Sequence, residues 1–301
     1  MTKNLANLII SIRPKQWTKN LILYIALPFS VSQLWAVGDL DQLTILLIKI
    51  SAGFIVFCAI SGSVYIINDI FDKTKDSNHL IKKDRPIASG DLPIPLAISF
   101  SFLLLVTPTI FAFFISTTFT IIILCYWILM ILYSLHLKKL IFIDLLVISI
   151  GFILRAIAGA VILQIPISPW LYVCTGLGAL FIGSAKRRSE ISNSKNNSQI
   201  QRETLKMYSA STLDQLISIF ATSTLMSYVL YSFLSTNLPS NHSMMLTIPF
   251  VIYGILRYIN IVYSKNIGEF PEEIILSDKP LITTIVLWIF FSISILVIFR
   301  T

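Results

Sequence analysis

The sequence predicts an all-α, polytopic membrane protein with nine transmembrane helices. Hydrophobic residues make up 55% of the 301 residues and charged residues only 13%, so little polar material is present to cover a soluble domain of this size. Apolar runs long enough to cross a bilayer recur along the chain. The nine expected spans are residues 19–37, 43–67, 95–115, 118–135, 141–163, 168–185, 213–234, 245–263 and 282–299.

The basic residues lie on one side of these spans. Nineteen of the 23 Lys and Arg residues precede or open the first span or follow the second, fourth, sixth and eighth, whereas the loops expected on the other side contain none. The positive-inside rule therefore predicts a multi-pass protein of the inner (plasma) membrane with a cytoplasmic N-terminus. The net charge of +8 indicates a surface for anionic lipid or phosphate rather than nucleic acid, because stacking aromatic residues do not alternate with these cations.

We expect a single domain over residues 1–301, with polar chemistry in two long cytoplasmic loops at about 68–94 and 186–212. The three cysteines all lie in apolar runs and lack the spacing of metal ligands. They are expected to be small buried hydrophobic residues.

The first long loop opens with an acidic motif directly after an apolar run. Asp69, Asp72 and Asp76 fall at positions i, i+3 and i+7, within an arc of about 60° on a helix, and Asn68 precedes them. Three like charges beside lipid are costly unless a cation lies among them. Oxygen-only ligands indicate Mg²⁺, which commonly bridges to phosphate. The alternative is a solvated acidic loop.

Other charged residues have more than one interpretation. Arg155 is expected near the middle of the bilayer, where it either lines a polar cavity or bonds to backbone carbonyls as a structural arginine. Asp144 lies about 16 Å away along the helix, too far to be its partner. A solvated acidic loop is expected for Glu272, Glu273 and Asp278.

These residues together resemble the UbiA superfamily of intramembrane prenyltransferases, whose nine-helix bundle carries an Asn-Asp-x-x-Asp-x-x-x-Asp motif after the second helix. Asn68, Asp69, Asp72 and Asp76 match each position. Further segments are similar to the branch of decaprenyl-phosphate phosphoribosyltransferases. They are Arg13-Pro14-Lys15-Gln16-Trp17, His79 with Lys82 and Arg85-Pro86-Ile87-Ala88, Leu154-Arg155-Ala156, Ser168-Pro169-Trp170, Lys186-Arg187-Arg188-Ser189-Glu190, and Pro271-Glu272-Glu273 through Asp278.

One departure from the wider superfamily is chemically informative. Aromatic prenyltransferases of this type carry a second Asp-rich motif after the sixth helix, whereas this loop begins with Lys186, Arg187 and Arg188. A basic cluster binds phosphate directly, without a metal bridge. One acidic motif and one basic cluster suit a substrate set with one Mg²⁺-bound diphosphate and further phosphate groups.

The resemblance implies Mg²⁺-dependent transfer of 5-phosphoribose from phosphoribosyl diphosphate to a polyprenyl phosphate in the bilayer, at a polar cavity that faces the cytoplasm. The product would be a precursor of lipid-linked arabinose or a related envelope sugar, and a homo-oligomer is compatible with this interpretation. Asp69, Asp72 and Asp76 are the expected catalytic residues and, with Asn68, the expected metal ligands. Expected substrate-binding residues are Lys19, Asn68, His79, Lys82, Arg85, Tyr133, Lys138, Arg155, Lys186, Arg187 and Glu190.

Other functions remain open at this point. A UbiA-type enzyme that prenylates an aromatic or other small acceptor is one alternative, which the missing second Asp cluster disfavours. An anion transporter is a second, favoured by Arg155 at mid-membrane but disfavoured by the concentration of charge at one rim. A lipid-binding scaffold has no positive support.

Overall fold

The computed structural model describes residues 2–78, 82–166, 168–197, 203–265, 268 and 270–299, and within these ranges every named element is a helix. The all-α prediction is therefore confirmed. In chain order the elements are α1 (Thr2–Ser11), η1 (Pro14–Ile25), α2 (Ala26–Phe29), α3 (Leu40–Phe71), α4 (Lys73–Ser77), η2 (Lys82–Asp84), α5 (Ile94–Ile115), α6 (Thr117–Leu135), η3 (Leu137–Lys139), α7 (Ile143–Leu163), α8 (Pro169–Asn197), η4 (Glu203–Met207), α9 (Ala210–Leu234), η5 (Ser243–Thr247), α10 (Ile248–Lys265), α11 (Pro271–Ser277) and α12 (Lys279–Phe299).

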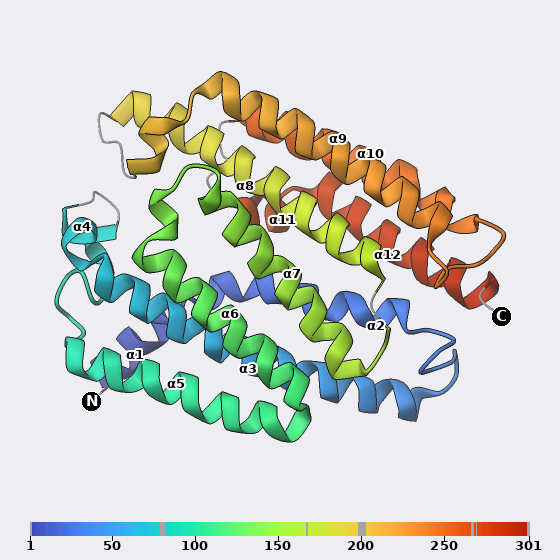
Figure 1. Cartoon of the computed structure of the whole chain (residues 1–301), viewed down its shortest axis with the longest axis horizontal. Helices are drawn as coiled ribbons and strands as arrows, with labels where there is room; N and C mark the ends of the chain where they lie inside the picture. Colours follow the sequence, from blue (N-terminus) through green and yellow to red (C-terminus); the bar gives the residue numbers. More distant parts are fainter. Residues whose placement is uncertain are drawn as a thin grey trace.

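Seven helical segments among the described residues are long and apolar enough to cross a membrane: α3, α5, α6, α7, α9, the continuous pair η5 and α10, and α12. They correspond to seven of the nine predicted spans. The N-terminus, α4 and the end of α8 lie at one end of the bundle, and the C-terminus lies at the other (Figure 1).

The predicted first and sixth spans are also helical but are not among these seven. The first is built from η1, a 3₁₀ helix of 12 residues with Pro14 in its first turn, followed by the four residues of α2. The sixth lies in α8, whose 29 residues continue past the predicted span into the charged stretch that begins at Lys186. Glycine, serine and threonine dilute the apolar character of α8.

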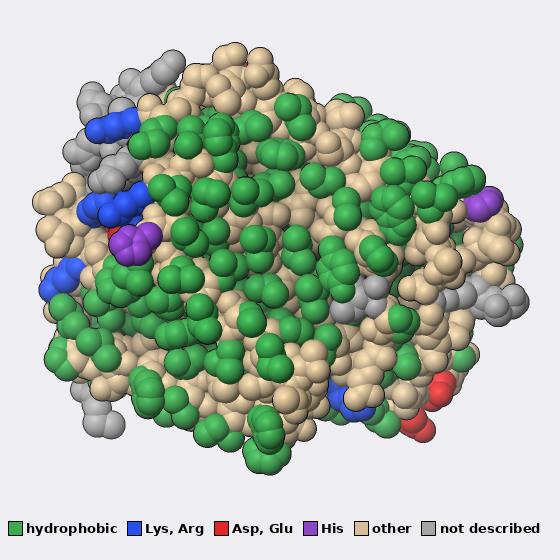
Figure 2. Space-filling model, in the orientation of Figure 1, with side chains coloured by type: hydrophobic (Ala, Val, Ile, Leu, Met, Phe, Trp, Pro, Cys, Tyr) green, Lys and Arg blue, Asp and Glu red, His purple; other side chains and the backbone are tan. Residues whose placement is uncertain are grey.

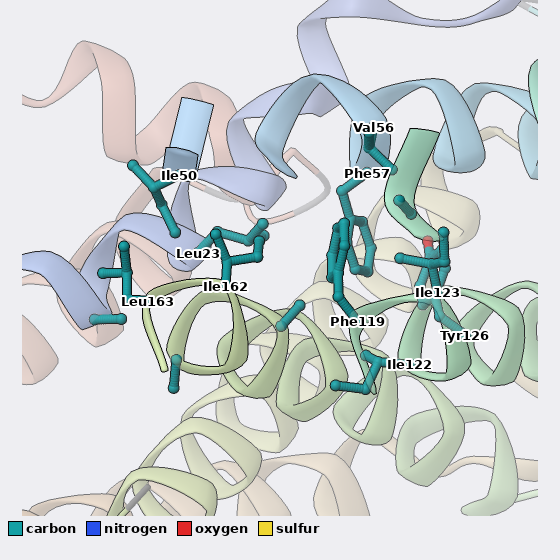
Figure 3. Close-up of a cluster of buried hydrophobic side chains, with 14 of the residues drawn as sticks. Leu23, Ile50, Val56, Phe57, Phe119, Ile122, Ile123, Tyr126, Ile162 and Leu163 are labelled. Carbon is teal, nitrogen blue, oxygen red and sulfur yellow. The ribbon is translucent and has the colours of Figure 1, made fainter. Parts of the chain in front are cut away.

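The largest hydrophobic core lies where η1, α3, α6 and α7 meet. Leu23, Ile50, Phe57, Phe119 and Ile162 are all buried there (Figure 3). A second core joins α8, α9, α10, α11 and α12, and α7 packs against α8 between the two. One dense core therefore fixes η1 and α3, the two elements that carry the N-terminal functional motifs.

The outside of the bundle is apolar, as a surface in lipid must be. Hydrophobic side chains cover most of the face in Figure 2, and lysines, arginines and a histidine gather at the end that also holds α4. On α5, Phe102, Phe111 and Phe114 are exposed.

Short polar side chains begin several of the helices. Asp39 accepts a hydrogen bond from the Gln42 amide at 3.0 Å at the start of α3, and Ser209 accepts one from the Thr212 amide at 2.9 Å at the start of α9. Each satisfies a backbone N–H that has no partner within the helix, which is costly to leave unpaired beside lipid.

A glycine permits the close approach of η1 to α7. A Cβ atom built on Gly159 would lie 2.1 Å from the Leu23 carbonyl oxygen, a distance that no side chain can tolerate. Because the obstacle is backbone, the clash is relieved only if η1 moves away from α7.

We therefore expect Gly159→Ala to destabilise the protein by about 1–3 kcal/mol or more, the usual cost of overpacking. Thermal unfolding in detergent would measure the loss. Gly178→Ala is the matched control, because its Cβ would meet only Thr224 Cγ2, at an ordinary 3.8 Å. An equal melting temperature for the two variants would contradict this account of the η1–α7 contact.

Candidate active site at the end of α3

The acidic motif spans the junction between α3 and α4. The long helix ends at Phe71, and Asp72 takes a non-helical backbone conformation (φ −91°, ψ 3°) before α4 begins. The Asp72 amide donates to the Asn68 carbonyl oxygen at 2.9 Å, and the Asp76 amide donates to the Asp72 carbonyl oxygen at 2.8 Å. The motif is therefore helical as predicted, with a break inside it.

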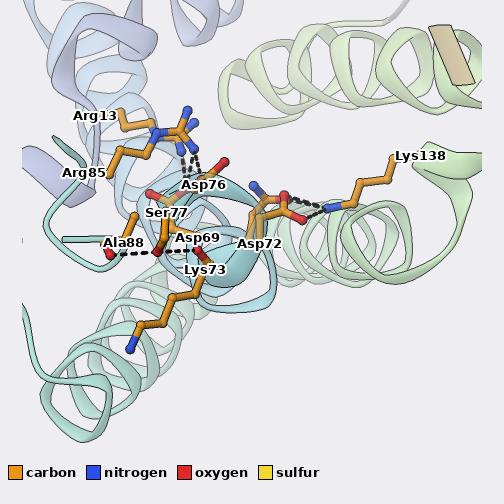
Figure 4. A network of polar contacts seen from close by, with 10 residues as sticks. Arg13, Asp69, Asp72, Lys73, Asp76, Ser77, Arg85, Ala88 and Lys138 are labelled. Atoms are coloured by element: carbon orange, nitrogen blue, oxygen red, sulfur yellow. Dashed lines mark hydrogen bonds and ion pairs between the residues drawn. The ribbon is translucent and has the colours of Figure 1, made fainter. Parts of the chain in front are cut away.

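This break divides the motif between two sides. Arg85 Nη1 donates to Asp69 Oδ1 at 3.1 Å and to Asp76 Oδ2 at 2.5 Å, and Arg13 also contacts Asp69 (Figure 4). Asp72 turns to the other side, where both of its carboxylate oxygens lie 2.7 Å from Lys138 Nζ.

Asn68 shares the side of Asp72. Its Oδ1 accepts a hydrogen bond from Lys138 Nζ at 3.4 Å. Lys138 comes from η3, between α6 and α7, and Arg85 comes from the segment after α4. Two sequence-predicted cations are thus brought onto the acidic motif from separate parts of the chain.

The donor set is chemically suited to Mg²⁺, although the carboxylates do not form one tight cluster. Asp69 and Asp76 are each 4% exposed, and one oxygen of each converges on a single arginine nitrogen. Within the part of the chain that the structure describes, no group of three or more His, Cys, Asp or Glu side chains is close enough to hold one metal ion. In this structure the side chains of Arg85 and Lys138 supply the positive charge that balances the carboxylates.

The three consecutive basic residues of α8 point in three directions. Successive residues of a helix are separated by about 100°, so Lys186, Arg187 and Arg188 face different neighbours. Arg187 is 2% exposed and donates from Nε to Asp144 Oδ2 at 2.9 Å. Arg188 donates to Asp214 on α9 at 2.8 Å. The two arginines are therefore engaged in joining helices.

Arg187 is the centre of a buried network of hydrogen bonds that includes Asp144, Glu190 and Tyr208. Its Nη1 donates to Glu190 at 2.8 Å, and the Tyr208 hydroxyl donates to the second oxygen of Asp144 at 2.8 Å. Burial alone would lower the pKa of Arg187, but Glu190, Tyr133 and Asp144 outweigh it and raise the pKa. Arg187 and Glu190 are predicted substrate-binding residues, and their contacts here are with each other and with the fold.

Lys19 and Lys186 lie near an acidic residue on α11. Glu272 is 8% exposed and accepts a hydrogen bond from Gln16 Nε2, and its Oε2 lies 3.9 Å from Lys19 Nζ. Lys19 in turn donates to the Gln16 side chain. Burial lowers the pKa of Lys186, partly offset by the attraction of Glu190 and Glu272.

The expectation of a solvated acidic loop at 272–278 is therefore wrong for two of its three members. Glu272 is buried, and Asp278 pairs with Arg257 through both carboxylate oxygens, at 3.1 and 2.8 Å. Glu273 is exposed as expected. The error arose because the segment folds as α11, which packs against η1 and α12.

Arg155 is held inside the core. It is 5% exposed, and its nitrogens donate to Asn20 Oδ1 at 2.7 Å, to the Gly151 carbonyl oxygen at 3.0 Å and to the Tyr126 hydroxyl at 2.7 Å. The guanidinium also lies against the ring of Phe57. These contacts favour the structural interpretation of this arginine over a role in binding substrate.

Three predicted residues remain to be located. Lys82 begins η2, beside the acidic motif, and Tyr133 at the end of α6 interacts electrostatically with Arg187. His79 lies outside the described residues.

Sequence reasoning missed four residues of this region. Two of them are Arg13, which contacts Asp69, and Tyr65, whose ring lies under the Arg13 guanidinium one helical turn before Asp69. The other two are Gln16, which accepts a hydrogen bond from Lys19, and Glu272, which lies near Lys19 and accepts one from Gln16. A sequence signal was present for Arg13 and Gln16, because Arg13, Gln16 and Lys19 are spaced three residues apart. Residues at this spacing are neighbours on the surface of an α-helix as well as a 3₁₀ helix.

Comparison with known families decides the identity of the fold. Residues 25–269 match the UbiA prenyltransferase family. The chain belongs to this family. Together with its apolar helices, this membership makes it an integral membrane protein.

Two relatives within the UbiA family cover nearly the whole chain. The decaprenyl-phosphate phosphoribosyltransferase of Mycolicibacterium smegmatis is 33% identical over 302 residues, covering 95% of this chain and 92% of the relative. The protein of the same name from Corynebacterium glutamicum is 34% identical over 296 residues, covering 96% and 86%.

Solved structures share the fold at low sequence identity. A UbiA homolog from Archaeoglobus fulgidus, bound to GPP and Mg²⁺, matches with a TM-score of 0.73 and 16% identity, covering 96% of this chain and 99% of that chain. A digeranylgeranylglyceryl phosphate synthase matches with a TM-score of 0.67 and 18% identity, covering 99% of each.

The network around Arg187 generates a stability prediction. Asp144→Asn removes the more deeply buried of the two carboxylates that pair with the Arg187 guanidinium, and we expect a loss of about 3–5 kcal/mol. Asp214→Asn, which breaks the more exposed pair with Arg188, should cost less than about 1 kcal/mol. Thermal or denaturant unfolding in detergent would measure both. Equal losses would show that burial does not distinguish the two pairs.

Proposed function

We propose that this chain transfers 5-phosphoribose from phosphoribosyl diphosphate to a decaprenyl-type polyprenyl phosphate and releases diphosphate. The acceptor oxygen would form the new bond to C1 of the ribose as the bond from C1 to the diphosphate oxygen breaks. Identity of 31–34% to proteins named decaprenyl-phosphate phosphoribosyltransferase, over more than nine-tenths of this chain, supports the assignment.

The observation that carries the proposal is the mixture of acidic and basic side chains at one end of the bundle. Asp69, Asp72 and Asp76 lie among Arg13, Arg85 and Lys138, with Lys19 and Lys186 nearby. A substrate pair that brings a diphosphate and further phosphate groups matches such a site. A prenyl diphosphate with an aromatic acceptor would bring no phosphate group beyond the diphosphate, and so matches this number of cations less well.

Asn68, Asp69, Asp72 and Asp76 would hold Mg²⁺. When bound, the metal supplies positive charge to the departing diphosphate. Arg85 and Lys138, two of the cations that contact these carboxylates, are then available to the phosphate oxygens by exchanging one anionic partner for another. The acceptor phosphate is already an anion, so this chemistry requires no strong general base.

The same proposal includes the topology. Nine crossings require η1 with α2, and α8, in addition to the seven clear spans. At a rise of about 2.0 Å per residue, the 12 residues of η1 cover about 24 Å, and α2 adds about 6 Å, which is close to the thickness of the hydrocarbon core. The distribution of basic residues supports our proposal that the acidic motif faces the cytoplasm from the inner membrane.

The decisive experiment is incubation of the purified protein with Mg²⁺, phosphoribosyl diphosphate and a short polyprenyl phosphate, followed by mass spectrometry of the lipid. We expect a product heavier by one phosphoribosyl group. Product formed instead from a prenyl diphosphate and an aromatic acid would favour the alternative enzyme, and uptake into proteoliposomes without any product would favour a transporter.

We expect Asp76→Asn to reduce turnover at least about a hundredfold, since the carboxylate acts where charge changes in the transition state. Asp91→Asn is the matched control, because this exposed carboxylate of the same loop pairs with Lys3. Initial rates in the lipid-product assay would test the difference. Near-normal turnover of the Asp76 variant, with the control unchanged, would remove Asp76 from the site.

Metal removal provides a separate test. Protein stripped with EDTA should lose turnover, and added Mg²⁺ should restore it. Full turnover of the stripped protein would contradict the assignment of the acidic motif to a metal.

A further inference from the structure

Glu272 lies at the junction of three elements that are distant in sequence. It stands in the first turn of α11, which packs against η1, and its carboxylate faces Lys19 of η1 and Lys186 of α8. Its side chain is 7% exposed. Its Oε2 is buried and has no hydrogen-bond partner among the described residues, although Lys19 Nζ lies 3.9 Å away. The carboxylate is therefore surrounded by cations without being locked to either one.

The electrostatics of the junction explain why a carboxylate is needed. Lys19 and Lys186 carry like charges, and repulsion from Lys19 contributes to lowering the pKa of Lys186. Burial alone would raise the pKa of Glu272, but Lys19, Lys186 and Gln16 outweigh it, and the pKa lies below its ordinary value. Glu272 therefore remains negatively charged and offsets the repulsion between the two ammonium groups.

We propose that Glu272 is a positioning residue that holds Lys19 and Lys186 together as one phosphate-binding pair. The inference rests on the proposed function, which requires phosphate groups beyond the diphosphate at the acidic motif. Lys19 gives one hydrogen bond to Gln16 and makes only a long contact with Glu272, which leaves it donors for a substrate phosphate.

The contrast with Arg187 supports a role in binding rather than in folding alone. The guanidinium of Arg187 makes short bonds to Asp144 and Glu190 at 2.9 and 2.8 Å and is 2% exposed. The side chain of Lys19 is 29% exposed, and its contact with Glu272 is looser. The short ion pairs of Arg187 join helices. The group formed by Lys19, Lys186 and Glu272 carries one more positive than negative charge, which suits a phosphate.

The pH dependence follows from the groups that face the pair. Lys186 faces Glu190, Arg187 and Lys19 in addition to Glu272, and Lys19 faces Arg13 and Arg155. Removing the charge of Glu272 removes an attraction that raises the pKa of Lys186, so this lysine would lose its proton at a lower pH. Because a neutral amine binds phosphate weakly, kcat/KM would begin to fall at a lower pH on the alkaline side.

The test compares Glu272→Gln with Glu273→Gln, which removes the same charge one residue along, from an exposed side chain. KM would be measured separately for phosphoribosyl diphosphate and for a short polyprenyl phosphate, and kcat/KM across the alkaline range. We expect Glu272→Gln to raise KM for at least one substrate about tenfold, as for the loss of one charge-assisted contact, and to move the alkaline limb to lower pH. The substrate affected identifies the phosphate that the pair binds.

Glu272→Asp keeps the charge on a shorter side chain and should restore part of the KM and most of the pH profile. If Glu272→Gln does not fold in detergent, Glu272→Asp alone must still raise KM by a smaller factor. An unchanged KM and alkaline limb in the folded variants, or equal effects of Glu272→Gln and Glu273→Gln, would overturn the proposal.

The outcome can be separated from the fate of the proposed function. If the wild-type protein does not turn over phosphoribosyl diphosphate, the proposed function fails. Binding of ribose 5-phosphate to wild type, Glu272→Gln and Glu273→Gln would then be measured by calorimetry. Weaker binding only in Glu272→Gln would uphold the phosphate-binding pair, and equal binding in all three would overturn it.

Discussion

Pairing of buried charges between separate segments holds the functional end of the bundle together. Asp69 contacts arginines from the N-terminal segment and from the loop after α4, Asp72 contacts Lys138 between α6 and α7, and Asp144 contacts Arg187 on α8. A charge near lipid is costly unless it is paired. Each pairing therefore fixes the position of one segment relative to another, and the candidate active site is assembled by the same contacts that satisfy its own charges.

This constraint also indicates how a site so rich in charge would accommodate the highly charged substrates that we propose. A diphosphate brings negative charge, and a divalent cation brings positive charge. If the metal binds the carboxylates, Arg85 can turn from Asp76, and Lys138 from Asp72, to the phosphate oxygens. Each charged group then still contacts a group of opposite charge. Binding then exchanges partners instead of creating unpaired charges, which would be costly in so buried a place.

The sequence was sufficient for those features that depend on composition and local order. Long apolar runs predicted α3, α5, α6, α7, α9, α10 and α12, because a spanning helix satisfies its own backbone in lipid. The acidic motif was recognisable because its residues are contiguous. The 3₁₀ conformation of η1 was not predictable, because an apolar run does not distinguish it from an α-helix. Burial of Glu272 was not predictable either, since it depends on how α11 packs against an element more than 250 residues earlier.

Helical geometry explains why the basic stretch of α8 has more than one function. Three adjacent cations form a cluster in the printed sequence, yet a rotation of about 100° per residue directs them to three different neighbours. Arg187 reaches α7, Arg188 reaches α9, and Lys186 faces η1 and α11. Two of the three therefore fix the helix in place, and the third is carried to the position where a phosphate is expected. We therefore propose a phosphate-binding role for Lys186 in preference to Arg187 and Arg188, because both arginines are held in ion pairs with other helices.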